Sequence, residues 1–282
     1  MNYRHAFHAG NFADVMKHLI VTRILLYLRG KETPFRVIDT HAGAGLYDLQ
    51  DERAQRTGEW RDGIGRFWHA ALAAPVAALA QPYRDAVAAL NEGGTPRLYP
   101  GSPLLARSLL RPQDRLVACE LEPQAAAALR RALGRDPRAR AVTIDGWTAL
   151  NAYIPPKERR GLVLIDPPFE AADEFASLAE RLMSAYRKWP TGLYAVWYPI
   201  KDEREVAAFA RRLASGGMAN VLRAELRLSE VPAAGRLAGS GMVIVNPPWT
   251  LQDELSTLMP PLAKILSGSA AGAKVDALIC KN

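Results

Sequence analysis

The sequence predicts an α/β protein built on one doubly wound, mostly parallel β-sheet. Short apolar strands alternate with helical segments over the middle of the chain, which is the pattern of parallel strands joined by helices. Several of the predicted strands end in an acidic residue. The last predicted strands instead suggest an antiparallel hairpin. With 282 residues, 49% of them hydrophobic, the chain can bury the core of one such domain with an insertion.

The first predicted elements are a helix and a strand. Asn11 or Asp14 can cap a helix whose apolar residues recur at helical spacing until Gly30. Residues 35–39 then form an apolar run that predicts the first strand, and this run breaks at the glycine-rich turn of residues 40–45.

A small helical insertion is predicted to follow. Residues 47–99 contain alanine-rich and tryptophan-containing segments with turn signals, but no clear strand. We therefore expect residues 47–99 to form an inserted helical subdomain, and residues 1–46 and 100–282 to form the main domain.

The remaining chain completes a predicted sheet of seven strands. Residues 221–229 alternate apolar and polar side chains, which predicts a half-exposed edge strand, and residues 242–245 predict its antiparallel partner after a turn. The segments before them are strands at 116–120, 141–144, 162–165 and 193–198, with helices at 123–133, 172–186 and 203–213.

The strand ends predict a binding site for a cofactor that contains adenosine. Ligands of open α/β sheets bind at the carboxyl ends of the strands. Here those ends carry Asp39, Glu120, Asp145 and Asp166. An acid after the second strand can accept the hydroxyls of a ribose, and an acid beside a backbone N–H can bind an adenine edge.

The glycine-rich turn favours a cofactor without phosphates. The turn, which runs from His41 through Gly43 to Gly45, lacks the third glycine of a dinucleotide fingerprint and has no phosphate-binding lysine. S-adenosylmethionine carries adenosine without a phosphate. We therefore predict S-adenosylmethionine as the cofactor.

Asp166-Pro167-Pro168-Phe169 predicts the reaction. Two prolines remove two backbone donors, which leaves nearby carbonyl oxygens free. A carboxylate and free carbonyls can accept from an exocyclic amino group, and an aromatic ring can stack on a base. A second such loop, Asn246-Pro247-Pro248-Trp249, follows an antiparallel strand, so we expect it to lie at the opposite edge of the sheet with a structural role.

The composition of the chain argues against a metalloprotein, a membrane-spanning protein and a secreted protein. The net charge of +7 favours a polyanionic partner only weakly. The two cysteines and the five histidines have no metal-ligand spacing, so we expect no metal. No apolar stretch is long enough to span a membrane, and the opening residues do not resemble a signal peptide. We expect a cytoplasmic monomer.

Motifs along nearly the whole chain resemble the RlmJ family, bacterial enzymes that methylate N6 of one adenine in 23S ribosomal RNA. The matching stretches are residues 3–11, Asp14, 17–18, 39–45, 99–103, Glu120, 145–146, 164–168, 197–199 and 246–249. The resemblance implies a Rossmann-like class I methyltransferase fold. It also implies a 23S ribosomal RNA substrate, which we expect to be protein-free or an early assembly intermediate.

The resemblance also implies roles for individual residues. It makes Asp166 the catalytic acid, and it implies that residues 1–18 contribute to both ligand sites. Tyr3 is implied to contact RNA. Lys17 could attract RNA phosphate or the cofactor carboxylate, and Phe169, where the family often has tyrosine, could stack on the base. The implied cofactor contacts are His18, His41, Ser102, Glu120, Asp145, Gly146 and Asp166.

Two alternatives remain open on the residues alone. A DNA adenine-N6 methyltransferase needs the same loop chemistry. A non-catalytic RNA-binding protein on the same fold could use the basic stretches at residues 130–140 and 157–160. Intact acids at every strand end argue against the non-catalytic alternative.

Overall fold

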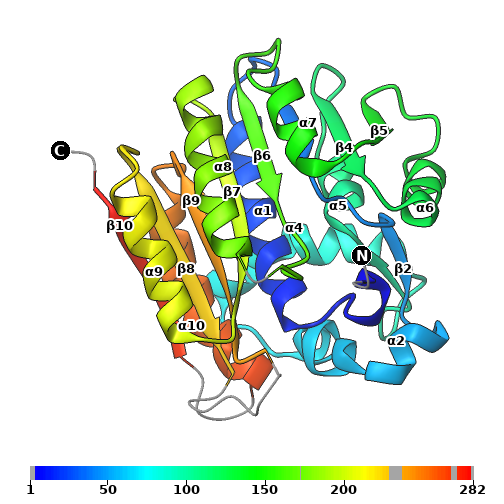
Figure 1. Cartoon of the computed structure of the whole chain (residues 1–282). Helices are drawn as coiled ribbons and strands as arrows, with labels where there is room; N and C mark the ends of the chain where they lie inside the picture. The colour runs from blue at the N-terminus through cyan, green and yellow to red at the C-terminus, as the bar shows by residue number, and fades with distance from the viewer. Residues whose placement is uncertain (1–3, 172, 229–236, 268–271, 281–282) are drawn as a thin grey trace.

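The computed structural model describes residues 4–171, 173–228, 237–267 and 272–280 (Figure 1). Its centre is a sheet of eight strands in the order β10-β8-β9-β7-β6-β1-β4-β5. Strands β7, β6, β1, β4 and β5 run parallel, whereas β9, β8 and β10 pair antiparallel. The strands are β1 (Arg36–Asp39), β4 (Arg115–Glu120), β5 (Ala139–Thr143), β6 (Gly161–Ile165), β7 (Leu193–Ile200), β8 (Val221–Arg227), β9 (Gly239–Val245) and β10 (Gly272–Ile279).

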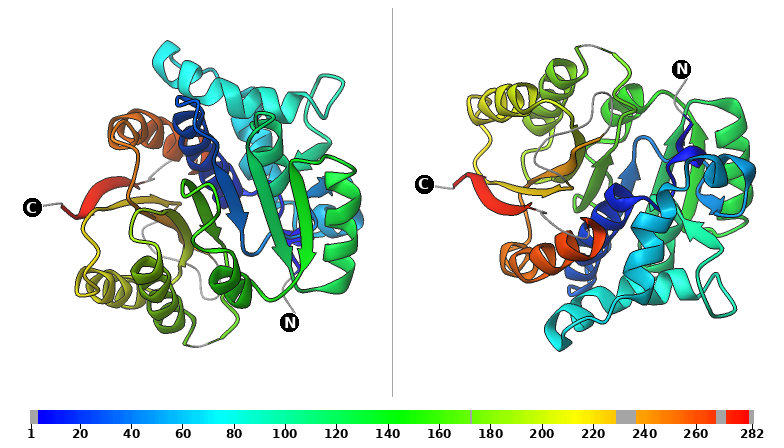
Figure 2. Two further views of the ribbon diagram at one scale, coloured as in Figure 1. Left: turned by 90° about the horizontal axis from the view of Figure 1, so that it is seen from above. Right: turned by 90° about the horizontal axis from the view of Figure 1, so that it is seen from below.

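Helices cover both faces of this sheet (Figure 2). The apolar residues that point to one face form the larger core, and those that point to the other face form a second core. The first face carries α1 (Phe12–Arg29), α5 (Ser102–Ser108), α6 (Pro123–Leu133) and α10 (Leu251–Ser267). The second face carries α7 (Gly146–Tyr153), α8 (Glu174–Lys188) and α9 (Glu203–Ala214). This arrangement confirms the predicted doubly wound α/β fold.

The long first helix follows from its sequence. The Asn11 side chain caps it by accepting from the backbone N–H of Asp14 at 3.0 Å. Fourteen of its 18 residues are buried, because α1 lies between the sheet and the other helices of its layer. The helix ends at Arg29 before Gly30, as predicted.

The inserted segment shares the main core. It contains a two-stranded sheet of β2 (Leu46–Asp48) and β3 (Leu98–Pro100), with helices α2 (Glu52–Thr57), α3 (Arg66–His69) and α4 (Ala74–Ala88) and a π-helical turn (Arg61–Gly65). Its Ile64, Phe67, Tyr83 and Val87 are at most 1% exposed and belong to the same apolar cluster as α1. The insertion therefore packs as a layer on α1 and α10.

Two predictions about the sheet were wrong. The sheet has eight strands and not seven, because β10 adds a strand that the sequence analysis did not place. Strand β8 is not an edge strand, because β10 pairs with it along its length and buries most of its residues. The expected range of β8 extended to Ser229, which lies outside the described residues, as does Ala172 at the predicted start of α8.

The Asn246-Pro247-Pro248-Trp249 loop lies where the topology argument placed it. Strand β9 is antiparallel to β7, so its carboxyl end meets the beginning of β7, away from Asp166. The Asn246 side-chain amide donates to the carbonyls of Pro190 and Gly192 at 2.8 and 2.7 Å. The side chain thus ties two turns together, which fits the expected structural role. No helix within the described ranges is long and apolar enough to cross a membrane.

Candidate active site

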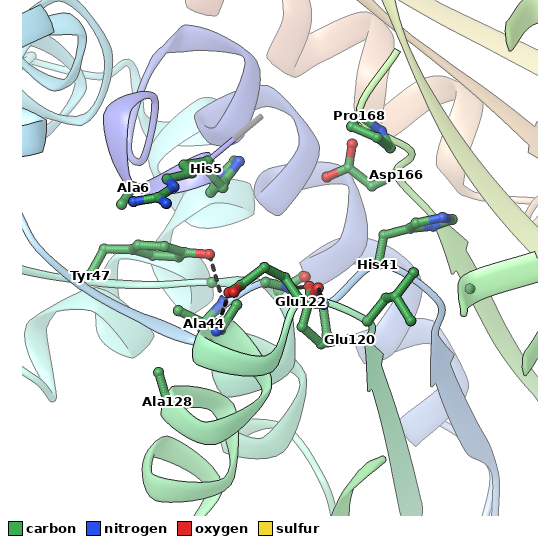
Figure 3. Close-up of a pocket in the computed structure, with 18 of the residues that line it drawn as sticks. His5, Ala6, His41, Ala44, Tyr47, Glu120, Glu122, Ala128, Asp166 and Pro168 are labelled. Carbon is green, nitrogen blue, oxygen red and sulfur yellow. Dashed lines mark hydrogen bonds between the residues drawn. The ribbon is translucent and has the colours of Figure 1, made fainter. Parts of the chain in front are cut away.

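One cavity of about 520 Å³ opens at the carboxyl ends of the parallel strands. Its volume is in the range of small-molecule sites. Asp166 and His41 lie at one end, Tyr47 lies at the other, and Glu120 lies between them (Figure 3). All seven predicted cofactor contacts line it, namely His18, His41, Ser102, Glu120, Asp145, Gly146 and Asp166.

Glu120 at the end of β4 is held by two backbone donors. Its Oε2 accepts from the N–H of Gly43 at 2.9 Å, and its Oε1 accepts from the N–H of Glu122 at 2.8 Å. These bonds fix the carboxylate against the glycine-rich turn. Each oxygen retains acceptor capacity, so Glu120 can still accept the two hydroxyls of a ribose.

His41 carries an unprotonated nitrogen beside Gly146. The single hydroxyl hydrogen of Thr40 is donated to the carbonyl of Leu164 at 2.9 Å, so Thr40 Oγ1 must accept from Nδ1–H of His41 at 2.8 Å. Nε2 is then unprotonated. Burial lowers the pKa of His41 to about 4, so the ring is neutral at physiological pH.

The turn after β5 approaches the His41 ring closely. Asp145 caps α7, with Oδ1 accepting from the backbone N–H of Thr148 at 2.8 Å. A Cβ at Gly146 would lie 2.6 Å from His41 Nε2 and 2.4 Å from the Thr40 carbonyl oxygen. Glycine is therefore required here, since any side chain would push α7 away from the cavity.

His18 is neutral, and two buried tyrosines hold its imidazole in place. Its Nδ1 shares a hydrogen bond with the Tyr99 hydroxyl at 2.8 Å, and Tyr99 in turn bonds to Tyr83 at 2.9 Å. The imidazole stacks on Tyr99 with ring centroids 5.5 Å apart. Burial lowers the pKa of His18 to about 3. The insertion supplies both tyrosines, so it helps to shape the cofactor end of the site.

Asp39 lies buried behind Ser102. Its Oδ2 accepts from the Ser102 hydroxyl at 2.6 Å, whereas its buried Oδ1 has no hydrogen-bond partner among the described residues. Burial, with a contribution from the nearby charge of Asp166, raises the pKa of Asp39 to about 7. An unsatisfied buried acid beside the cavity suits a ligand that brings a positive charge.

Asp166 belongs to a buried chain of charges. The Lys17 ammonium contacts Asp166 Oδ2 at 2.5 Å and Asp14 Oδ1 at 2.9 Å. Asp14 Oδ2 accepts from the Gly10 N–H at 2.9 Å and lies 2.9 Å from Nε2 of His5. Burial opposes the charge on Lys17, but the two carboxylates raise its pKa well above the usual range. Lys17 therefore remains charged between them.

This geometry adds a role for Lys17 to the expected one. The sequence suggested that its ammonium attracts RNA phosphate or the cofactor carboxylate. In the structure Lys17 is 4% exposed and its ammonium lies between two acids of the protein. It is therefore placed to orient Asp166, and Lys17 also lines the cavity.

Phe169 does not line the cavity in this structure. Its ring packs edge-on against Phe175 at 5.0 Å and against Trp197 at 5.7 Å between centroids. It follows the two prolines directly and is half-buried, so it lies beside the predicted base position. Tyr3, the other expected RNA contact, lies outside the described residues.

The fold brings here several residues for which the sequence predicted no individual role. Asp14 was predicted as a helix cap and as a residue that matches the family, but without a role of its own in the site, although its spacing of three from Lys17 places both on one face of α1. His5, Tyr47 and Trp147 also line the cavity, and Trp147 contacts the His41 ring edge-on at 5.1 Å. No local pattern distinguishes these aromatic residues from core residues. Among the described residues, no cluster of side chains could hold a metal ion.

These residues fit S-adenosylmethionine. The cavity offers acidic acceptors at three strand ends and neutral histidines, and the buried carboxyl of Asp39 lies behind its wall; together these suit a cofactor with a ribose diol and two positive charges. Fold and site together define a class I S-adenosylmethionine-dependent methyltransferase.

Comparisons with known proteins give the family. The family model described as "Ribosomal RNA large subunit methyltransferase D, RlmJ" matches residues 32–279. The chain belongs to this RlmJ family. It is 39% identical to Ribosomal RNA large subunit methyltransferase J of Escherichia coli over 280 residues, which cover 99% of both chains. It is 38% identical to the enzyme of the same name from Haemophilus influenzae over 97% of this chain and 96% of that one.

A solved structure shares the fold. Protein LPL1258 of Legionella pneumophila is 34% identical, with a TM-score of 0.87 over 96% of this chain and 98% of that chain. The likeness spans the insertion as well as the sheet, since it covers nearly the whole of both chains.

Proposed function

We propose that this chain transfers a methyl group from S-adenosylmethionine to N6 of one adenine in 23S ribosomal RNA. Membership of the RlmJ family and the names of the two enzyme relatives support ribosomal RNA as the substrate. The observation that carries the proposal is the position of Asp166-Pro167-Pro168 at the edge of the cofactor cavity, with Asp166 fixed by Lys17.

The proposed catalytic step depends on how Asp166 holds the amine. The N6 lone pair of adenine is delocalised into the ring, which makes the amine a weak nucleophile. If the Asp166 carboxylate and a proline carbonyl accept from its two N–H groups, the nitrogen becomes more tetrahedral and its lone pair is released. The cofactor supplies an electrophilic methyl group bound to a positively charged sulfur.

The methyl transfer forms one bond and breaks one bond. With S-adenosylmethionine held by these residues, the N6 lone pair would form the new N–C bond as the S–C bond of the methyl donor breaks, and the electrons of that bond would return to sulfur. N6 loses one proton, to Asp166 or to water beside it. Most of the rate gain comes from position and complementary charge. The adenine must leave its helix stack to reach the loop, so a flipped or unpaired adenine is expected.

Individual roles follow the same proposal. We assign Asp166 as catalytic and Tyr3 and Phe169 as contacts to the RNA, with the Phe169 ring turning from Trp197 toward the base. The cofactor contacts are His18, His41, Ser102, Glu120, Asp145, Gly146 and Asp166, all of which line the cavity. The substrate is protein-free 23S RNA or an early assembly intermediate, and the enzyme acts as a monomer in the cytoplasm.

The first test is an Asp166→Asn variant. The amide keeps the shape but removes the charge that draws N6–H toward it. Charge-assisted hydrogen bonds contribute about 1.5–3 kcal/mol, so methyl transfer should fall at least about tenfold to hundredfold. Turnover is measured with labelled cofactor, and the exposed Asp253→Asn serves as the control. Near-normal turnover of Asp166→Asn would remove Asp166 from the mechanism.

Substrate class is tested with the unchanged enzyme. Labelled cofactor is offered with protein-free 23S RNA, with assembled large subunits and with DNA. Methylation of the RNA at adenine N6 supports the proposal. Preferential labelling of DNA would favour the alternative DNA methyltransferase, and cofactor binding without transfer to any substrate would favour a non-catalytic RNA-binding protein.

A further inference from the structure

A second cavity, of about 200 Å³, lies at the amino-terminal edge of the sheet and is lined by four arginines. Arg36 comes from β1 and Arg115 from β4, Arg138 directly precedes β5, and Arg140 is the second residue of β5. The remaining wall includes Tyr153 at the end of α7. This edge is opposite to the edge that carries the acidic cofactor cavity.

The strand register explains why these arginines meet. Arg36 pairs with Arg115, and Leu116 pairs with Ala139, so Arg115 lies beside Arg138. Three arginines thus form a row across three neighbouring strands, about 4.8 Å apart from strand to strand. Their side chains share the face of α7, because the next residue of β4 on that face, Val117, packs against α7.

Two of the four charges are neutralised by the protein. Arg36 donates two hydrogen bonds of 2.9 Å to Glu158. Arg138 donates to both oxygens of Asp136, at 3.0 and 2.7 Å. Such forked pairs fix the guanidinium planes. Glu158 belongs to the basic stretch 157–160 and Arg138 to the stretch 130–140, so the fold brings together two stretches that are separate in the sequence.

The other two guanidinium groups make no hydrogen bond to a carboxylate within the described residues, although Arg115 lies near enough to Glu158 to help lower the pKa of that carboxyl. Arg115 uses only Nη1, which donates to the carbonyls of Pro112 and Asp114. Its other guanidinium nitrogens have no acceptor among the described residues. Arg140 is exposed on the edge strand and has no hydrogen-bond partner within the part of the chain that the structure describes. Four arginines here face only the carboxylates of Glu158 and Asp136, and like charges side by side in a sheet repel each other, so the excess of positive charge favours an anion.

We propose that this arginine pocket binds a backbone phosphate of the substrate RNA, away from the target adenine. Its volume is below the roughly 300 Å³ at which sites for whole small molecules begin, which suits one phosphate of a longer chain. Arginine guanidinium groups match phosphate geometry. Arg140 at the open edge of the sheet gives a polymer access.

The location is within reach of RNA that occupies the active site. Helix α7 begins at the cofactor cavity, with Gly146, and ends at Tyr153 beside the arginine pocket. Its eight residues span roughly 12 Å. The pocket therefore anchors a flank of the same RNA whose adenine enters the cavity. This inference rests on the proposed RNA substrate.

The test measures RNA affinity separately from chemistry. Arg140→Gln is the first variant, because this exposed side chain makes no structural hydrogen bond that its loss would break. Binding of a 23S RNA fragment is followed by fluorescence anisotropy from low to high salt. Methyl transfer at saturating RNA and cofactor affinity are measured on the same samples. Arg204→Gln, an exposed arginine on α9, is the matched control.

The proposal expects Arg140→Gln to weaken RNA binding about threefold to tenfold. The slope of log affinity against log salt should fall by about 0.7–0.9, the value for one phosphate contact. Arg115→Gln should act in the same direction and Arg115→Lys should retain most of the affinity. Turnover at saturating RNA, cofactor affinity and the Arg204→Gln control should not change.

Two results would overturn the inference. One is an unchanged affinity and salt slope in both Arg140→Gln and Arg115→Gln. The other is competition by ATP as effective as competition by RNA, which would assign the pocket to a free phosphate compound. Failure of the proposed function looks different: wild-type enzyme would bind RNA with the same arginine dependence but would transfer no methyl group to it.

Discussion

Lys17 and its two carboxylate partners dominate the energetics of the site at the scale of single residues. Lys17 is buried between Asp14 and Asp166, and its carboxylate contacts are 2.9 and 2.5 Å long. A buried ion pair need not stabilise the fold, since desolvation opposes it, but removing one partner leaves charges uncompensated. The Lys17 ammonium therefore compensates the negative charges of Asp14 and Asp166, which would otherwise repel each other in the folded protein.

The buried pair predicts that substitutions of Lys17 and Asp14 have non-additive effects on the free energy of unfolding. Lys17→Met should lower the free energy of unfolding by about 3–5 kcal/mol, because two buried carboxylates then face each other. Adding Asp14→Asn should recover part of that loss, whereas turnover should stay low because Asp166 is no longer oriented. Denaturant unfolding of the single and double variants measures the coupling. Strictly additive free energies would show that Lys17 and Asp14 do not act as one unit.

Asp39 predicts a pH dependence of stability. Burial raises its pKa to about 7, above the ordinary value of 3.8, so the folded state holds a proton more tightly than the unfolded chain. The stability that this proton contributes is complete below about pH 4 and is lost as pH rises toward and through 7. The loss is on the order of 4 kcal/mol.

Asp39→Asn provides the measurement. The amide keeps an acceptor for Ser102 but does not titrate in this range. The melting temperature of the wild type should therefore fall relative to that of Asp39→Asn between pH 5 and 8. Saturating S-adenosylmethionine should reduce this difference, if its positive charge compensates Asp39. Parallel pH profiles of the two proteins would mean that Asp39 does not titrate in this window.

At the scale of elements, the sequence predicted those whose signals are local. Helix α6 has the predicted bounds of residues 123–133, because Pro123 and the glycine after Leu133 mark its ends. Strand β10 was not predicted. Its residues 272–279 mix charged and apolar side chains after a glycine-rich run, and pairing with β8 decides their conformation. The same pairing makes β8 an interior strand, although its alternation resembles that of an edge.

The contact between the insertion and the start of α1 gives a prediction at this scale. The N–H of Ile64 donates to the Gly10 carbonyl at 2.8 Å, and a Cβ at Gly63 would lie 2.1 Å from that oxygen. Gly63→Ala must therefore separate the two segments. We expect the melting temperature to fall by several degrees and cofactor affinity to weaken, because α1 carries His18.

Gly30→Ala is the matched control for this variant. It lies at the end of the same helix with φ of −64°, and its added Cβ comes no closer than 3.3 Å to a neighbour. Its melting temperature should stay near that of the wild type. If Gly63→Ala melts at the same temperature as Gly30→Ala, the backbone contact does not hold the insertion in place.

For the whole molecule, the parallel-strand rule was enough to predict the cofactor side of the site but not the charge chain behind it. The carboxyl ends of four parallel strands lie at one edge of the sheet, independently of the loops that follow them. Glu120, Asp145 and Asp166 could therefore be assigned to one cavity from the sequence. Lys17 and Asp166 are 149 residues apart, and neither segment carries a local pattern that points to the other. Their contact follows only from the packing of α1 against the sheet.

This packing connects the described part of the amino-terminal segment to Asp166. His5 contacts Asp14, Asp14 contacts Lys17, and Lys17 contacts Asp166, while His5 itself lines the cavity. The hydroxyl of Thr57 donates to the Phe7 carbonyl and attaches the segment to the insertion. Any ligand that fixes Asp166 should therefore also stabilise the first turns of the chain.

We predict that S-adenosylmethionine slows amide hydrogen exchange in residues 4–18, by at least about tenfold at a hundredfold excess over its dissociation constant. Helix α9, which contributes no residue to the cavity, serves as the internal control. In Asp14→Asn the link is broken, so cofactor should still protect the glycine-rich turn at residues 40–45 but not residues 4–10. Equal exchange of residues 4–18 with and without cofactor in the wild type would mean that the segment is a fixed cap, and that the chain from His5 to Asp166 transmits nothing between the two ligands.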